Sequence, residues 1–63
     1  MMVTADGRQY VLFEGAKVRH LLLAAFSIIP DDVETVDQWG NIVGLDGELC
    51  EGDRFSFRRT RDR

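Results

Sequence analysis

This 63-residue chain has one histidine and one cysteine, and the two lie far apart in the sequence. The sole histidine, His20, has no second ligand or nucleophile at a useful spacing, and such a histidine is most often a surface or boundary side chain. The sole cysteine, Cys50, would need a base or a helix N-terminus beside it to become nucleophilic, but it lies between Leu49 and Glu51. We therefore expect no catalytic residue.

Two further patterns contain residue types that occur in ligand sites. Asp31, Asp32 and Glu34 are close in sequence, but their spacing does not match a calcium-binding loop. The "GLDG" segment at 44–47 lacks the lysine and the helix that follow a phosphate-binding loop. The sequence therefore predicts a protein that is not an enzyme and that holds no metal and no cofactor.

Length and composition predict one small domain in a reducing compartment. A chain this short buries only about 60% of the surface of its unfolded form, so its stability is marginal. With 44% apolar and 30% charged residues, the chain suits a compact core better than disorder. A lone cysteine, no apolar run near the roughly 18 residues of a membrane span, and no signal-peptide pattern favour a cytoplasmic protein without a membrane partner.

The charges are unevenly placed along the chain. Residues 31–53 contain acidic but no basic residues, whereas residues 54–63 are rich in arginine. The net charge of −3 argues against nucleic-acid binding, because phosphate contacts need clustered lysine and arginine. We interpret residues 60–63 as a solvated basic tail that follows a domain at 1–59.

The first half of the chain predicts a hairpin and then a helix. Asp6 and Gly7 tolerate positive φ and indicate a two-residue turn that pairs Ala5 with Arg8 and Val3 with Tyr10. The apolar residues of 18–25 then follow helical spacing, which predicts a helix at about 17–27 that Pro30 helps to end.

The second half predicts strands. Branched residues alternate with polar ones in 34–38, a turn follows at 39–41, and 42–43 form a short strand. In the last strand, Phe55 and Phe57 point to one face and Arg54, Ser56 and Arg58 to the other.

These elements follow the order ββαβ(β)β, which predicts an α+β fold of the β-grasp layout. The helix must bury its apolar stripe across one face of a mixed sheet of four to five strands, with the first and last strands parallel neighbours. The residues expected in the core are Val3, Tyr10, Leu12, Val18, Leu21, Leu22, Ala25, Phe55 and Phe57.

Two segments resemble ubiquitin-like β-grasp proteins. "FEGAKVRHLL" is similar to their helix entry, and "LDGELCEGDRFSF" resembles their closing segment. The resemblance covers nearly the whole chain and is strongest to bacterial ubiquitin-like domains of the multiubiquitin type, then to sulfur-carrier proteins of thiamine and molybdopterin synthesis, and then to TGS domains. It implies a β-grasp fold.

The chain departs from this family at two places. The helix N-cap position holds Lys17, which cannot accept a backbone hydrogen bond, and its use in place of Thr or Ser costs about 1 kcal/mol. The last residues are Thr-Arg-Asp-Arg, whereas sulfur carriers and conjugated ubiquitins resemble one another in a Gly-Gly terminus. This difference favours a protein-interaction module over a modifier or sulfur carrier that is activated at its C-terminus. The acidic composition disfavours an RNA-associated TGS-like domain.

We therefore expect a monomeric, non-catalytic ubiquitin-like module that binds a protein partner. Val11 and Phe13 are candidate contact residues on the open face of the sheet. The alternative is that Phe13 folds over the sheet edge, or that the register differs by one. Trp39 is a third candidate, with a half-buried place at the edge of the core as its alternative.

Overall fold

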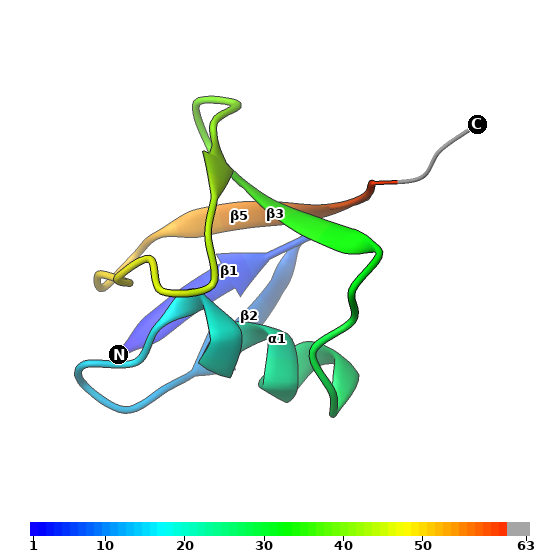
Figure 1. Cartoon of the computed structure of the whole chain (residues 1–63). Helices are drawn as coiled ribbons and strands as arrows, with labels where there is room; N and C mark the ends of the chain where they lie inside the picture. The colour runs from blue at the N-terminus through cyan, green and yellow to red at the C-terminus, as the bar shows by residue number, and fades with distance from the viewer. Residues whose placement is uncertain (61–63) are drawn as a thin grey trace.

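The computed structural model describes residues 1–60, which form a mixed five-stranded sheet and a helix (Figure 1). The elements are β1 (Met2–Ala5), β2 (Arg8–Val11), α1 (Val18–Phe26), β3 (Val33–Asp37), β4 (Ile42–Val43) and β5 (Arg54–Arg59). The predicted α+β class and element order are therefore confirmed. Helix α1 is one residue shorter at each end than expected.

The sheet has the strand order β2-β1-β5-β3-β4. Strands β1 and β5 are parallel, as expected, and every other pair is antiparallel. The parallel pairing is short, because it joins only Thr4 to Arg54 and Ala5 to Phe55. Backbone hydrogen bonds extend it, since the Thr4 N–H donates to the Asp53 carbonyl at 2.9 Å and the Asp6 N–H to the Phe55 carbonyl at 3.0 Å.

The β1–β2 turn has the predicted geometry. Asp6 and Gly7 have φ values of 51° and 81°, and the strands pair Ala5 with Arg8 and Val3 with Tyr10. Both φ values are positive, as a type I′ turn requires. The Asp6 carboxylate also accepts the N–H of Phe57 at 3.3 Å, so this turn fixes β5 as well as the hairpin.

Helix α1 ends because Ser27 turns left-handed. Ser27 has a φ of 69° and donates its N–H to the Leu23 carbonyl at 2.9 Å. The helix therefore ends at Phe26, four residues before Pro30, and residues 28–32 cross to β3. This early end leaves the apolar residues Ile28 and Ile29 in a connecting segment rather than in a helix face.

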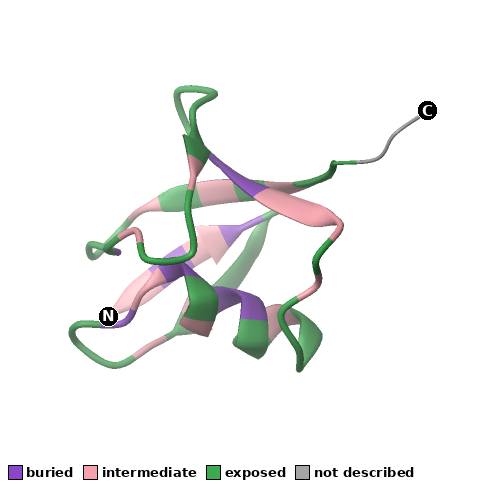
Figure 2. Cartoon of the chain, in the orientation of Figure 1, coloured by how far each residue is buried: buried purple, intermediate pink, exposed green. Residues whose placement is uncertain are grey.

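The core lies between α1 and one face of the sheet (Figure 2). The helix stripe and Val3 are buried as predicted, whereas Ala25 is half-buried and lies outside the core cluster. The predicted Tyr10, Leu12, Phe55 and Phe57 are half-buried around the cluster. Residues that sequence analysis did not place in the core are Ala5, Ala16 and Leu49.

The other face of the sheet is mainly polar. Strand pairing places Thr4 beside Arg54, Glu34 beside Arg58 and Val36 beside Ser56 on this face. The Arg58 Nε donates to Glu34 Oε2 at 2.7 Å. The face without the helix therefore carries charged and hydroxyl side chains beside the buried Val36.

The leucines at 22 and 23 provide a matched test of this packing. Leu22 is 1% exposed and Leu23 is 42% exposed, although both lie in the middle of the same helix. We expect Leu22→Ala to lower the free energy of unfolding by about 2–5 kcal/mol, because it leaves a cavity in the core. Leu23→Ala should change it much less. Urea unfolding followed by circular dichroism measures both, and equal losses would contradict the packing.

Thr35 provides a second test of the core. It is 2% exposed, and its hydroxyl has no hydrogen-bond partner among the described residues. A buried hydroxyl without a partner costs about 1–3 kcal/mol, so the nearly isosteric Thr35→Val should stabilise the domain by about 1 kcal/mol. Thermal unfolding measures the change, and a clear loss of stability would show that the hydroxyl is hydrogen-bonded in solution.

Candidate interaction surface

The three residues proposed from the sequence as contact sites are all exposed but do not lie together. Val11, Phe13 and Trp39 are 77%, 58% and 75% exposed. Val11 ends β2 at one edge of the sheet, whereas Trp39 lies in the turn between β3 and β4 at the opposite edge. Phe13 lies beyond β2 in the connection to α1. One surface cannot contain all three.

Of the two placements left open for Phe13, the structure has the one away from the open sheet face. The chain leaves the sheet after Val11, and the Phe13 ring packs edge to face on His20 of α1, with ring centroids 4.8 Å apart. Strand alternation therefore no longer sets the direction of the Phe13 side chain. The ring instead covers the imidazole that helps to begin the helix.

Trp39 lies at a tightly bonded turn and not at the edge of the core. The Asp37 Oδ1 accepts the N–H groups of Trp39 at 3.0 Å and Asn41 at 2.8 Å. Gly40 has a φ of 88°, which completes the reversal. Because the Asp37 carboxylate and the backbone fix this turn, the indole ring itself is left in solvent.

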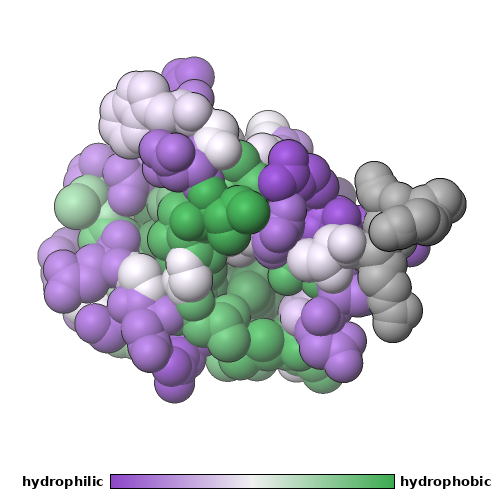
Figure 3. Space-filling view, turned by 45° about the horizontal axis from the view of Figure 1, so that its top comes forward, coloured by the Kyte–Doolittle hydropathy of each residue, from purple (hydrophilic) through white to green (hydrophobic). Residues whose placement is uncertain are grey.

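Four large apolar residues at and just after the C-terminal end of α1 are exposed. We call Leu23, Phe26, Ile28 and Ile29 the helix-end surface; their exposed fractions lie between 38% and 64%. Figure 3 shows apolar side chains in the middle of the view and along its lower border, on the side where α1 lies. Phe26 is held in place by an edge-to-face contact with Phe57 at 5.1 Å. The sequence signal was the run "LLLAAFSII", which has more apolar residues than one helix face can bury.

A pocket of about 220 Å³ adjoins this surface between β2 and α1. Phe26 belongs to both, which makes the helix-end surface continuous with the pocket. The residues that line the pocket are Ala5, Asp6, Arg8, Tyr10, Ala25, Phe26 and Phe57.

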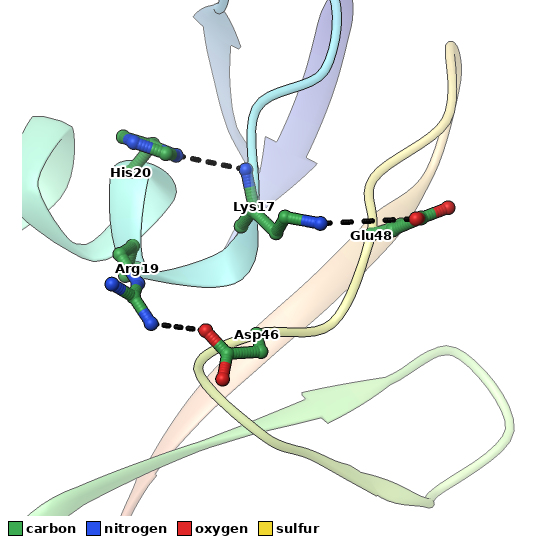
Figure 4. A network of polar contacts seen from close by, with 5 residues as sticks. All are labelled: Lys17, Arg19, His20, Asp46 and Glu48. Carbon is green, nitrogen blue, oxygen red and sulfur yellow. Dashed lines mark hydrogen bonds and ion pairs between the residues drawn. The ribbon is translucent and has the colours of Figure 1, made fainter.

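The N-terminal end of α1 is occupied by structural contacts (Figure 4). The N–H groups of Val18 and Arg19 donate to the carbonyls of Gly47 and Leu45 at 3.0 and 3.1 Å. The Lys17 N–H donates to His20 Nδ1 at 2.9 Å. Within residues 1–60, the Lys17 side chain accepts no capping hydrogen bond from the helix, as the sequence predicts. Backbone carbonyls of the 44–48 loop accept the first helical N–H groups instead.

Two ion pairs join the same elements. Arg19 pairs with Asp46, and Lys17 Nζ lies 3.7 Å from Glu48 Oε2. The four side chains are between partly and largely exposed, so each pair contributes only about 0–1 kcal/mol. The backbone bonds therefore hold the loop, and the charged side chains add to them.

Cys50 is exposed, and its N–H donates to Asp53 Oδ2 at 2.8 Å. Among residues 1–60, no three His, Cys, Asp or Glu side chains lie close enough to hold a metal ion, and no helix is long and apolar enough to cross a membrane. No protein-family model matches the chain, and no curated protein matches its sequence.

The capping loop generates a prediction with a matched control. A Cβ on Gly47 would lie 2.5 Å from Val43 Cγ1 and 3.1 Å from the Gly44 carbonyl oxygen, whereas a Cβ on Gly44 meets nothing within 4 Å. Gly47→Ala should therefore displace the loop and destabilise the domain by about 1–3 kcal/mol, while Gly44→Ala should be nearly neutral.

Amide hydrogen exchange distinguishes a local from a global effect of Gly47→Ala. The Val18 and Arg19 amides, which bond to the loop, should lose more protection than those of β1. Unchanged protection of these two amides would contradict the capping role of the loop.

Proposed function

We propose that this chain is a non-catalytic, ubiquitin-like protein-interaction module of the β-grasp fold. The fold assignment is supported by the element order, by the helix that packs on one sheet face, and by parallel β1 and β5 at the sheet centre. We infer that the partner binds at the helix-end surface. Its exposed large apolar side chains, of which Ile28 and Ile29 are adjacent in sequence, are the feature most typical of a protein contact site.

The partner contacts the helix side in this proposal and not the open sheet face. The open face carries Arg54, Arg58 and Glu34, and the exposed Val11 lies at its margin. In contrast, Leu23 and Phe26 come from a rigid helix, and Phe26 is braced by Phe57. Because Phe57 already holds the Phe26 ring, this ring loses little conformational entropy when a partner buries it together with the neighbouring aliphatic side chains.

Partner capture with matched variants tests this function. Wild type, Leu23→Ser and Ile28→Ser would be used as baits in a lysate of the source organism, with Val11→Ser and Ile42→Ser as controls of equal chemistry at exposed sites elsewhere. Quantitative mass spectrometry should find proteins retained by wild type and both controls. Leu23→Ser and Ile28→Ser should weaken their retention about tenfold.

The stability of each bait must be measured first, so that unfolding is not mistaken for lost binding. A partner that binds all five baits equally would contradict the helix-end surface. Covalent attachment of the chain to a target protein, detected in the same samples, would instead favour a ubiquitin-like modifier.

A further inference from the structure

We propose that the face of the sheet opposite α1 holds a binding site for the phosphate group of a small molecule. Gln9, Thr4 and Arg54 form this site, one from each of three neighbouring strands. The sheet separates the site from α1 and from the helix-end surface. The inference therefore goes beyond the proposed protein contact and does not depend on it.

Strand pairing brings these three residues into one row. Thr4 of β1 lies opposite Gln9 of β2 on one side and Arg54 of β5 on the other. Thr4 lies between the buried Val3 and Ala5, so strand alternation points its side chain away from the core. Directly paired residues share a face, so Gln9 and Arg54 point the same way. Neighbouring strands are about 4.8 Å apart, which places a long side chain on each side of the short Thr4.

An open hollow lies at this row. Its volume of about 620 Å³ falls within the roughly 300–1,000 Å³ that is typical of small-molecule sites. The residues that line it are Thr4, Gly7, Gln9, Arg54 and Phe55. All three residues of the row therefore line one hollow, and a ligand in it can contact the whole row at once.

The row offers hydrogen-bond donors of three kinds. The Arg54 guanidinium has several N–H donors in a planar fork, the Gln9 carboxamide has an NH₂ group and Thr4 has a hydroxyl. A phosphate monoester has three acceptor oxygens in different directions, whereas the two oxygens of a carboxylate lie in one plane. Donors at both ends and in the middle of the row therefore fit a phosphate group better, and the guanidinium supplies the positive charge.

Arg54 is available to an anion. It is exposed and forms no ion pair among residues 1–60, whereas Arg58, on the same face of β5, is paired with Glu34. One available arginine suits a single phosphate group. It does not suit the repeated phosphates of a nucleic acid, which need clustered lysine and arginine.

The acidic residues next to the row in sequence are held by backbone hydrogen bonds. Asp6 accepts the Phe57 N–H at 3.3 Å, and Asp53 accepts the Cys50 N–H at 2.8 Å. In the described part of the chain, neither carboxylate lies within ion-pair distance of Arg54. Their charges still offset that of the guanidinium, so the directed hydrogen bonds of the row, and not a broad positive field, select the ligand.

Titration with inorganic phosphate and with glycerol 3-phosphate tests the site. Each compound is added to the isotope-labelled chain at constant ionic strength, so that the screening of surface charges does not change. NMR should show saturable shifts of the Arg54 Nε–H, the Gln9 carboxamide and the Thr4 amide. Tighter binding of glycerol 3-phosphate would identify a phosphate monoester as the ligand, and equal binding would identify free phosphate.

Two substitutions remove the same charge from the same face of β5. Arg54→Gln should weaken phosphate binding about fivefold or more, because it removes charge-assisted hydrogen bonds. Arg58→Gln should weaken it less than about twofold, because this charge is farther away and screened by salt. Thr4→Val keeps the shape of the side chain but removes the hydroxyl, and it should weaken binding about threefold. This variant decides the question if Arg54→Gln does not fold.

The outcomes separate this site from the proposed protein contact. Shifts that rise without saturation, or equal losses in Arg54→Gln and Arg58→Gln, would overturn the phosphate site. Leu23→Ser, which changes the helix-end surface, should bind phosphate like wild type. Failure of phosphate binding leaves the protein contact standing, because partner capture tests that contact through other residues.

Discussion

The packing of the 44–48 loop against α1 depends on how the first amides of the helix find acceptors. Helical N–H groups at an N-terminus have no partner within the helix, and Lys17 cannot accept a hydrogen bond through its side chain. The carbonyls of Leu45 and Gly47 take this role, which fixes the 44–48 loop against the helix. Leu49 follows that loop directly and becomes part of the core. A capping defect in the sequence is therefore resolved by a contact between segments far apart in the chain.

The two ends of the helix differ in what surrounds them. The 44–48 loop contacts the first turn of α1, whereas Leu23 and Phe26 in the C-terminal half, with the following Ile28 and Ile29, are exposed. Ser27 contributes by ending the helix early in a left-handed conformation. The pocket between β2 and α1 adjoins that half of the helix through Phe26. In our account the helix-end surface is where a partner binds.

Features encoded within a few neighbouring residues were predictable from the sequence. Asp6-Gly7 fixed the hairpin register, and the alternation of Phe55 and Phe57 fixed the face of β5. The packing of Leu49 and the backbone cap were not predictable, because they arise from long-range contacts of a loop without periodicity. Phe13 was misplaced on the open sheet face because strand alternation was extended past the end of β2. For Trp39, the exposed place in a turn holds and the half-buried alternative does not, because a carboxylate, and not packing, holds that turn. The helix-end surface was present in "LLLAAFSII", but only the structure shows which of those residues the core leaves exposed.

The most direct test of the central claim is a map of the contact surface by NMR, using a partner retained by the wild-type domain. Backbone amide and side-chain methyl signals would be followed as the unlabelled partner is added. The account predicts that the largest changes fall on Leu23, Phe26, Ile28 and Ile29. Changes centred on Thr4, Arg54 and Arg58 of the open sheet face, with the helix end unaffected, would contradict it.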